Sequence, residues 1–188
     1  MHATTSHDPA CACLEHPLHP SMRVRDALHH YLAENGFTVE AYDAPRTDAS
    51  FLGVQFSVPN TPGHRVGIML HDLHHVATGF GTDLVGEGEV SAWEIRGGLR
   101  GLDAYVSSLV ITGTMVGLAR APRRTLRAAK AIAGPRRSLF AVATPYETLL
   151  DMTVGDLRAL LGAPREGVAT TPRRLHAFAP KAAAPIAA

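Results

Sequence analysis

The segment from Thr61 to Gly79 constrains the fold more than any other, because it carries both a helix start and a helix stop. Thr61 can cap a helix whose first position is Pro62, a residue that fits the first turn because no backbone N–H is needed there. Gly79 is placed to end the same helix, since glycine readily adopts the left-handed conformation of a C-terminal cap. The pattern therefore predicts one continuous helix between Thr61 and Gly79.

The rest of the chain shows the same helical signals and lacks convincing period-two strands. Ser21 can cap a first helix that Gly36 would end. Residues 50–57 are the stretch that could instead be extended or an irregular crossing. The other predicted helices cover about 85–98, 101–119, 121–133 and 146–162. The sequence therefore predicts an all-α fold, a compact helical domain.

Two capping-box patterns occur in the last predicted helix, from Thr144 to Glu147 and from Thr153 to Asp156. In such a box the first side chain accepts a hydrogen bond from the backbone of the third residue after it. We therefore expect two helical pieces that meet near Thr153.

Length and composition indicate a single globular domain. The chain has 188 residues, of which 46% are hydrophobic and 19% are charged, which excludes a disordered or collagen-like protein. Periodic apolar positions are scarce in residues 1–20 and 164–188, so we predict a mobile leader, a folded domain over 21–163 and a mobile Pro/Ala-rich tail. The leader holds a Cys/His cluster of Cys11, Cys13, His16 and His19, whose C-x-C spacing is tighter than that of usual zinc sites.

The chain carries no signal of export or of a membrane span. The first 20 residues contain acids, prolines and histidines where a signal peptide has an apolar region. The longest uncharged apolar stretch, Ala104 to Ala119, is shorter than the roughly 18–20 residues that cross a bilayer. With only two cysteines there is no disulfide framework. These features predict a cytoplasmic protein.

Charge is distributed unevenly, although the formal net charge is only +1. Up to Asp103 the chain has 6 Lys and Arg against 13 Asp and Glu, whereas the remainder has 12 against 4. A basic block between Arg120 and Arg137 contains Arg120, Arg123, Arg124, Arg127, Lys130, Arg136 and Arg137. Such a block favours an anionic partner, such as phospholipid head groups, a phosphate or diphosphate, or nucleic acid, although a solvated helix face is an equal alternative. The partner we expect is an anionic membrane surface, contacted peripherally through Arg120 to Arg137. Nucleic-acid binding is not expected, because aromatic interleaving and known motifs are missing.

The chemistry-bearing motif lies within the predicted helix. His71 and His75 are four residues apart and share one helix face, so their imidazoles can converge on a metal ion. Asp72 borders that face and can supply a carboxylate oxygen to the metal or to a bound water. His74 points roughly three-quarters of a turn away from His71 and is not chosen as a ligand.

A second helix is needed to complete the site. Glycines after the first helix let the chain turn back, so Glu87 can face the histidine pair. Asp83 is placed to cap the second helix or to support a ligand. Composition alone produces H-D-x-x-H followed by this glutamate on the order of 0.001 times in such a chain. The alternative is that His71 and His75 are core or surface histidines without a metal.

The motif H-D-x-x-H-x11-E resembles the signature of the coenzyme Q biosynthesis protein four (Coq-four) family. It is formed by His71, Asp72, His75 and Glu87 and continues into an apolar helix through Trp93. The similarity is tight over about residues 68–98 and looser over 22–163. It implies an all-helical, homodimeric protein that holds a long lipid in an apolar groove, with a divalent metal, usually zinc, beside the lipid head. The four motif residues would be the metal ligands.

The resemblance also implies an activity. Family members in ubiquinone biosynthesis are associated with replacing a ring carboxyl by hydroxyl and with organising other enzymes of the pathway. Glu89 departs from the family pattern and is a second candidate for a ligand or general base, so Asp72 or Glu89 would be the catalytic acid/base partner. The donor set suits Zn²⁺ or Fe²⁺. Candidate groove residues are Val106, Leu109, Val110, Ile111, Met115, Val116 and Leu118.

Two functions follow from this reading. The first is a metal-dependent, lyase-type enzyme acting on a hydrophobic ring or polyketide-type substrate, by decarboxylation, elimination or hydration beside a carbonyl, in quinone or specialised-metabolite biosynthesis. The second is a non-catalytic lipid-binding scaffold for a biosynthetic complex, in which the same metal would grip a head group. Turnover with purified components separates the two.

Overall fold

The computed structural model describes residues 18–51, 54–131 and 137–169, and these are mainly helical. The helices are α2 (Val24–Glu34), α3 (Pro62–Thr78), α4 (Leu84–Gly97), α5 (Ala104–Arg120), α6 (Pro122–Lys130), α7 (Tyr146–Asp151) and α8 (Val154–Leu161), with short 3-10 helices η1 (Val39–Asp43) and η2 (Leu139–Ala141). The predicted all-α class is confirmed. One antiparallel hairpin, β1 (Arg46–Phe51) and β2 (Val54–Pro59), occupies the stretch for which an extended piece was one expectation.

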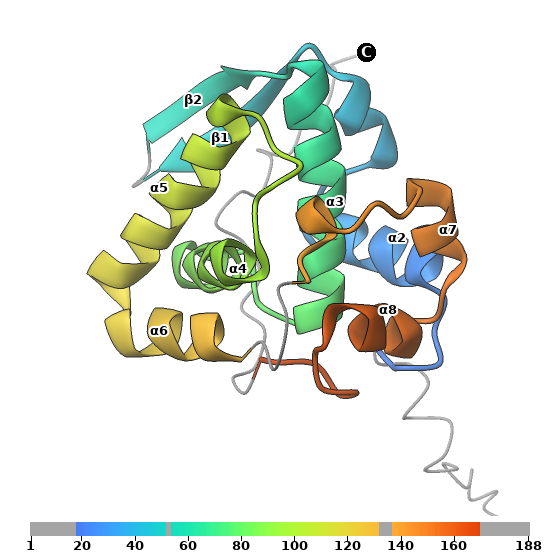
Figure 1. Ribbon diagram of the computed structural model, residues 1–188. Coiled ribbons are helices and arrows are strands. Elements are labelled where there is room, and N and C mark those ends of the chain that lie inside the picture. The colour runs from blue at the N-terminus through green and yellow to red at the C-terminus, as the bar shows by residue number, and fades with distance from the viewer. Residues whose placement is uncertain (1–17, 52–53, 132–136, 170–188) are drawn as a thin grey trace, which may run out of the picture.

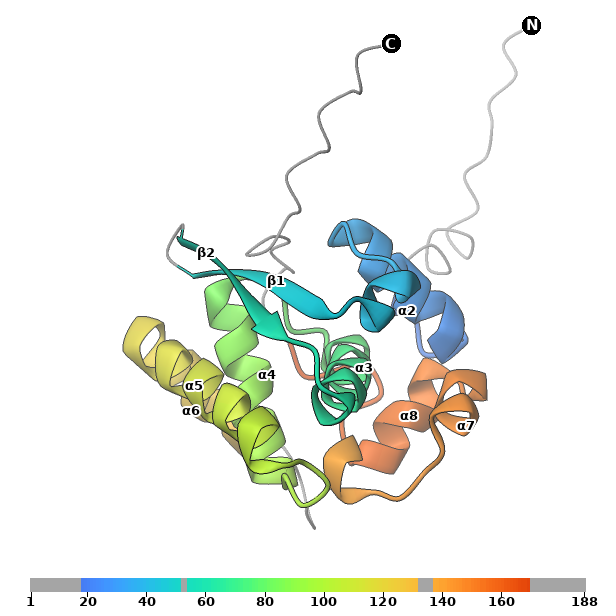
Figure 2. The ribbon, with the colours of Figure 1, turned by 90° about the horizontal axis from the view of Figure 1, so that it is seen from above.

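Helix α3 stands at the centre of the molecule (Figure 1). Helices α2, α7 and α8 lie on one side of it and α4, α5 and α6 on the other, as the view from above also shows (Figure 2). The hairpin pairs Arg46 with Pro59 at its open end, and the Tyr105 hydroxyl of α5 donates to the Pro59 carbonyl at 3.3 Å. The site-bearing helix is thus enclosed by neighbours from both halves of the chain.

Most helix ends lie where the sequence predicts them, but two predicted cap residues, Ser21 and Thr144, do not cap a helix. Thr153 caps α8 by accepting from the Asp156 N–H, so the predicted break near Thr153 is confirmed. Ser21 does not cap α2, because its hydroxyl bonds to His19 and the N-cap is Arg23. Thr144 does not cap α7, because Pro145 takes the N-cap position.

The displaced start of α2 has a tertiary cause. The Val24 N–H donates to the Met152 carbonyl at 2.9 Å, and the Val154 N–H donates to the Met22 carbonyl at 2.8 Å. These bonds hold the backbone before α2 extended against the start of α8, so the helix cannot begin at Ser21. Here the hydrogen bonds between distant segments override the local preference for a helix cap at Ser21.

A single core joins the two sides of α3. It contains apolar faces of the first helix and the last, with Trp93 fully buried as the expected core anchor. Its fully or almost fully buried members include Val24, Leu28, Leu73, Val76, Val90, Leu149, Leu157 and Leu161. Their removal from water supplies the main stabilisation of the fold.

Close packing of α4 against α5 depends on glycine. A side chain at Gly88 would collide with the backbone of Gly117, and one at Gly113 would collide with Ser91. The two helix backbones therefore approach more closely than larger residues allow. This contact fixes α5 beside the face of α4 that carries the site.

The packed part of the chain is slightly longer than the predicted domain 21–163. Leu18 is buried in the core, and the N–H groups of Val168 and Ala169 donate to the Thr78 carbonyl at 2.8 and 2.9 Å. The rest of the predicted leader and tail, including Cys11, Cys13 and His16, lies outside the described residues. None of the helices in the described ranges combines the length and the hydropathy needed to cross a lipid bilayer.

Candidate metal centre and cavity

Helix α3 presents its histidines in the register that the sequence predicts. The Thr61 hydroxyl accepts from the His64 N–H at 3.1 Å, and Gly79 ends the helix with a left-handed φ of 79°. His71 and His75 lie on one face, with ring centroids 4.7 Å apart in an edge-on arrangement. The two imidazoles therefore meet on the side of α3 that faces α4.

Helix α4 supplies the carboxylate opposite these rings. Asp83 caps it by accepting from the Gly86 N–H at 2.7 Å, which confirms the predicted capping role. Glu87 lies in the first turn and Glu94 two turns later, so both are on the side that faces α3. Glu87 thereby reaches the histidine pair, as the sequence spacing predicts.

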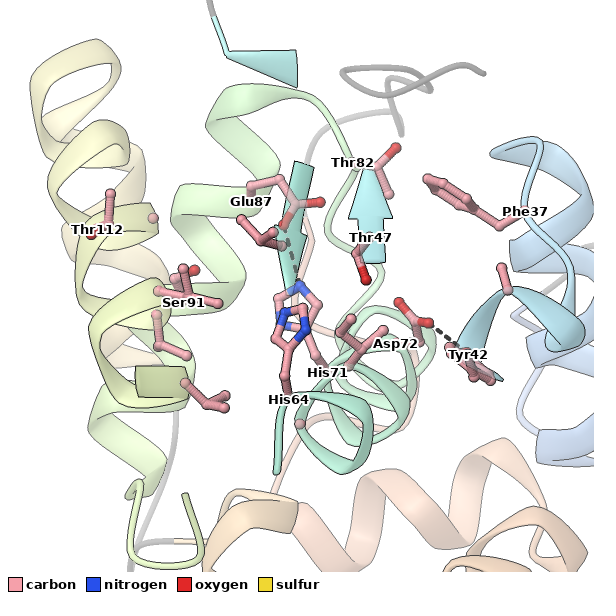
Figure 3. Close-up of a pocket in the computed structure, with 18 of the residues that line it drawn as sticks. Phe37, Tyr42, Thr47, His64, His71, Asp72, Thr82, Glu87, Ser91 and Thr112 are labelled. Carbon is pink, nitrogen blue, oxygen red and sulfur yellow. Dashed lines mark hydrogen bonds and ion pairs between the residues drawn. The ribbon is translucent and has the colours of Figure 1, made fainter. Parts of the chain in front are cut away.

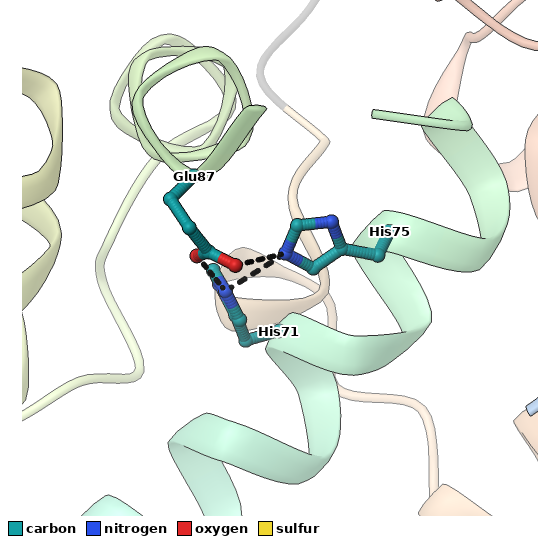
Figure 4. A group of neighbouring side chains, drawn as sticks. All are labelled: His71, His75 and Glu87. Atoms are coloured by element: carbon teal, nitrogen blue, oxygen red, sulfur yellow. Dashed lines mark hydrogen bonds and ion pairs between the residues drawn. The ribbon is translucent and has the colours of Figure 1, made fainter. Parts of the chain in front are cut away.

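His71, His75 and Glu87 form a compact group of three possible ligands (Figure 4). The two Nε2 atoms are 3.1 Å apart, the His71 Nε2 is 3.2 Å from Glu87 Oε2, and the His75 Nε2 is 3.4 Å from Glu87 Oε1. Bonds of about 2.0–2.1 Å to a tetrahedral metal place neighbouring ligand atoms about 3.3–3.4 Å apart. The spacing of the three side chains therefore fits one metal ion.

The outer nitrogens of both rings are already engaged. The His71 Nδ1 donates to Glu94 Oε1 at 2.8 Å, and the His75 Nδ1 donates to the Phe80 carbonyl at 3.1 Å. Since carboxylates and carbonyls only accept, each Nδ1 carries a proton, and each Nε2, once free of a proton, presents its lone pair to the position of a metal ion. This is the tautomer that metal-binding histidines adopt when an outer partner orients them.

The charges of the group reinforce one another. Burial alone would raise the pKa of Glu87, but the charge of His75 and hydrogen bonds to both histidines hold it far below its usual range. Burial alone would lower the pKa of His71, but the carboxylates of Glu94 and Glu87 raise it well above the ordinary value of 6.5. The carboxylates are therefore ionised and attract a positive charge, either a proton or a metal ion.

A second buried pair, Glu94 and His74, lies behind the group of three. The His74 Nδ1 donates to Glu94 Oε1 at 2.7 Å, and its Nε2 accepts from the Leu139 N–H at 2.9 Å. Burial lowers the pKa of His74. Burial would raise the pKa of Glu94, but its contacts with His71 and His74 lower it to about 2. A neutral His74 thus holds an ionised Glu94 in place beneath His71.

The sequence excluded His74 as a ligand, and the structure places it outside the group of three. Its role as a support for Glu94 was missed, and so was Glu94 itself. One signal was present: Glu94 follows Glu87 by seven residues, two helical turns, and so shares its face.

Asp72 lies beside the group of three but is not part of it. Its Oδ2 accepts from the Tyr42 hydroxyl at 2.5 Å, and its side chain lines the neighbouring cavity (Figure 3). Burial raises the pKa of this carboxyl, and burial together with the Asp72 charge raises that of the Tyr42 hydroxyl, which stays protonated. A fourth-ligand role for Asp72 stays a prediction.

The structure does not bring Glu89 to the site. Because Glu89 follows Glu87 by two residues, its side chain points about 200° around the helix axis from that of Glu87, toward α6. There Arg124 donates to both of its carboxylate oxygens, at 2.9 and 2.7 Å. A carboxylate fixed by an arginine on the far side of α4 is neither a ligand nor a general base for this group, so we withdraw that alternative.

A cavity of about 750 Å³ adjoins His71 and Glu87 (Figure 3). Its walls are mainly apolar and come from α2, η1, the hairpin, α3, α4 and α5. Of the predicted groove residues, Val106, Leu109, Val110 and Val116 line it. The prediction is wrong for Ile111 and Met115, which are 50% and 61% exposed on the outer side of α5.

The described part of the basic block lies at the end of α5 and on α6, whereas Arg136 lies outside the described residues. Arg120, Arg123, Arg127 and Lys130 are exposed, whereas Arg124 turns inward to Glu89. Leu126 is 51% exposed among them. This part of the surface therefore combines positive charge with the exposed apolar side chain of Leu126.

No protein-family model matches this chain, and neither does any curated protein or solved structure.

Proposed function

We propose that this chain is a Coq-four-like, metal-dependent enzyme that holds Zn²⁺ or Fe²⁺ with His71, His75 and Glu87 and acts on a hydrophobic small molecule. The observation that carries the proposal is the position of this group at the wall of a largely apolar cavity. Pockets of about 300–1,000 Å³ with a few convergent polar groups are typical of small-molecule sites. The combination supports a substrate that is mainly apolar, with an oxygen-bearing end beside His71.

The reaction class follows from the donor set and the cavity. A divalent metal bound by such residues supplies Lewis acidity, which polarises a carbonyl or carboxylate or lowers the pKa of water. The apolar walls exclude bulk water, which strengthens the charge interactions at the reacting end. Decarboxylation, elimination or hydration beside a carbonyl, on a quinone precursor or a polyketide-type ring, fits these conditions best.

Asp72 is the residue we assign to proton transfer. It lies on the cavity wall, and its raised pKa brings a carboxyl closer to working pH, where proton transfer is most effective. The hydrogen bond from Tyr42 fixes one carboxylate oxygen and leaves the other for substrate. Tyr42 would thus orient the group without itself giving up its proton.

Metal content and turnover test this proposal together. We expect purified protein to hold about one Zn²⁺ or Fe²⁺ per chain and to convert a quinone precursor or a pathway intermediate, followed by product mass. Asp72→Asn should keep its metal and slow conversion by about 10²–10⁴-fold, the usual contribution of acid–base help. Asp26→Asn, the same change at an exposed position of α2, is the matched control.

The test also separates the enzyme from the scaffold. If wild-type protein binds metal and the candidate substrates but converts none of them, the enzyme proposal fails and a lipid-binding scaffold replaces it. If it binds no metal, both versions of the proposal fail.

A further inference from the structure

His64 is a buried polar side chain of the cavity that the group of three does not use. It lies seven residues before His71 on the same face of α3 and lines the cavity (Figure 3). Only 5% of the residue is exposed, and its ring packs at a tilt against Tyr105 with centroids 5.6 Å apart. Its Nδ1 is buried without a hydrogen-bond partner among the described residues.

The unpartnered Nδ1 decides where the proton of this ring lies. In proteins, a buried N–H without an acceptor is rarer than a buried acceptor without a donor. The proton therefore lies on Nε2. Burial also lowers the pKa of His64, so the ring is neutral and carries a single N–H. That N–H is the donor left to meet a ligand in the cavity.

On the α3 wall of the cavity, few other side chains between His64 and His71 could donate a hydrogen bond to a ligand. On α3 the intervening cavity residues are Gly67 and Ile68, and a side chain at Gly67 would collide with Val106 of α5. Seven residues of helix span about 10 Å. Along the α3 wall, a molecule that runs from His71 therefore crosses an apolar stretch before it reaches His64.

We infer that His64 donates a hydrogen bond from Nε2 to an oxygen of an elongated, mainly apolar ligand, about 10 Å from the ligand atom that lies at His71, His75 and Glu87. The inference rests on the proposed function, because it takes the group of three as the anchor of the other end. It narrows the substrate class to molecules with two separated oxygen functions. A plain hydrocarbon tail would leave the His64 N–H unpaired.

Hydroxamic acids test this inference, because a hydroxamate binds zinc and its chain can be varied. The probes are decanohydroxamic acid and its four analogues with one ketone at C6, C7, C8 or C9, titrated calorimetrically into zinc-loaded full-length protein. We expect one ketone position to bind wild type about 3–10-fold more tightly than the parent, the contribution of one neutral hydrogen bond.

Two substitutions separate hydrogen bonding from packing. His64→Phe keeps a ring against Tyr105 but has no donor, so it should lose the ketone preference while still binding the parent. His64→Gln places an amide N–H near the position of Nε2 and should restore the preference. His30→Phe, the same change at an exposed position of α2, should leave the preference intact. Zinc content and thermal unfolding of each variant show that it is folded.

The outcomes distinguish the two levels of the proposal. If wild type takes up zinc and binds the parent but favours no ketone, or if His64→Phe keeps the preference, the role of His64 is overturned and the metal site stands. If wild type takes up neither zinc nor iron, the proposed function fails and the role of His64 fails with it.

Discussion

The two sides of α4 carry carboxylates with opposite uses. On the side that faces α3, Glu87 and Glu94 contact histidines. On the side that faces α6, Glu89 accepts hydrogen bonds from Nε and Nη2 of Arg124. Both environments are buried or nearly so, and both neutralise negative charge. The difference lies in the partner, because a histidine can give up its proton near neutral pH and an arginine cannot.

This difference separates reactive from structural charge in one helix. The hydrogen bonds to Glu89 raise the pKa of Arg124 further above its usual value, so the guanidinium keeps its charge at every accessible pH. The histidines beside Glu87 can exchange a proton for a metal ion. The identity of the cation, rather than the burial of the carboxylate, determines which side of α4 could hold a metal ion.

The largest effect is expected from neutralising one carboxylate on each side. Glu87→Gln removes a ligand and should weaken zinc binding by more than about 100-fold, beyond the 10–100-fold typical of residues that only orient a ligand. Glu89→Gln should leave zinc affinity unchanged and lower the unfolding free energy by at most about 1 kcal/mol, since Arg124 is 38% exposed. Competition with a chelator and thermal unfolding measure the two quantities. Equal losses of zinc affinity would contradict the comparison.

A smaller effect is expected for Glu94, which contacts the proposed ligand His71 but is not itself a ligand. Glu94→Gln keeps the shape of the side chain but weakens its hold on the His71 Nδ1–H, so zinc affinity should fall by about 10–100-fold. The same chelator competition gives the value. An affinity equal to that of wild type would show that Glu94 does not orient His71.

The pH dependence of metal binding should follow from His71. Its pKa is raised above 6.5, so the metal-free ring is protonated at and below neutral pH and the proton competes with the metal. Affinity should therefore rise with pH by up to about tenfold per unit, and level off above the folded-state pKa. Zinc titrations in two buffers of different ionisation enthalpy should detect the released proton. No proton release at pH 7 would exclude this mechanism.

Helix α6 extends the comparison to two arginines one turn apart, where the smallest effect is expected. Arg124 serves the interior, whereas Arg127 is exposed beside Leu126 and is proposed to contact anionic lipid. Arg127→Gln should reduce binding to phosphatidylserine vesicles about fivefold, since one basic residue near such a surface contributes about 1 kcal/mol. Arg100→Gln, outside the block, should have no effect. Flotation that is absent in wild type, or insensitive to salt, would remove the membrane proposal.

The sequence predicted the elements that depend on local signals. The cap at Thr61, the stop at Gly79, the cap at Asp83 and the break at Thr153 all act within a few residues, so their patterns are visible in the chain. The face shared by His71 and His75 follows from helix periodicity in the same way. The prediction of Glu89 as a site residue is wrong because it ignored that periodicity. Glu89 follows Glu87 by two residues, which places the two side chains on nearly opposite sides of the helix.

Contacts between distant segments could not be read from the sequence. The bond from Tyr42 to Asp72 joins residues 30 apart, and that from Leu139 to His74 joins residues 65 apart. No short pattern marks either pair, because the pairing depends on how the helices pack rather than on local spacing. The same reason explains why the first helix begins at Val24 instead of directly after Ser21.

The hydrogen bond from the Leu139 N–H to His74 ties two binding events together. It begins an unbroken series that continues through Glu94 to the His71 ring, and the residue after Leu139, Phe140, lines the cavity. A molecule that shifts Phe140 together with Leu139 would therefore also shift the support of His71, a proposed metal ligand. Thermodynamic reciprocity then requires that whatever factor the cavity's occupant adds to metal affinity, the metal adds to the affinity of the occupant. Each would be measured correctly only with the other held at a known concentration.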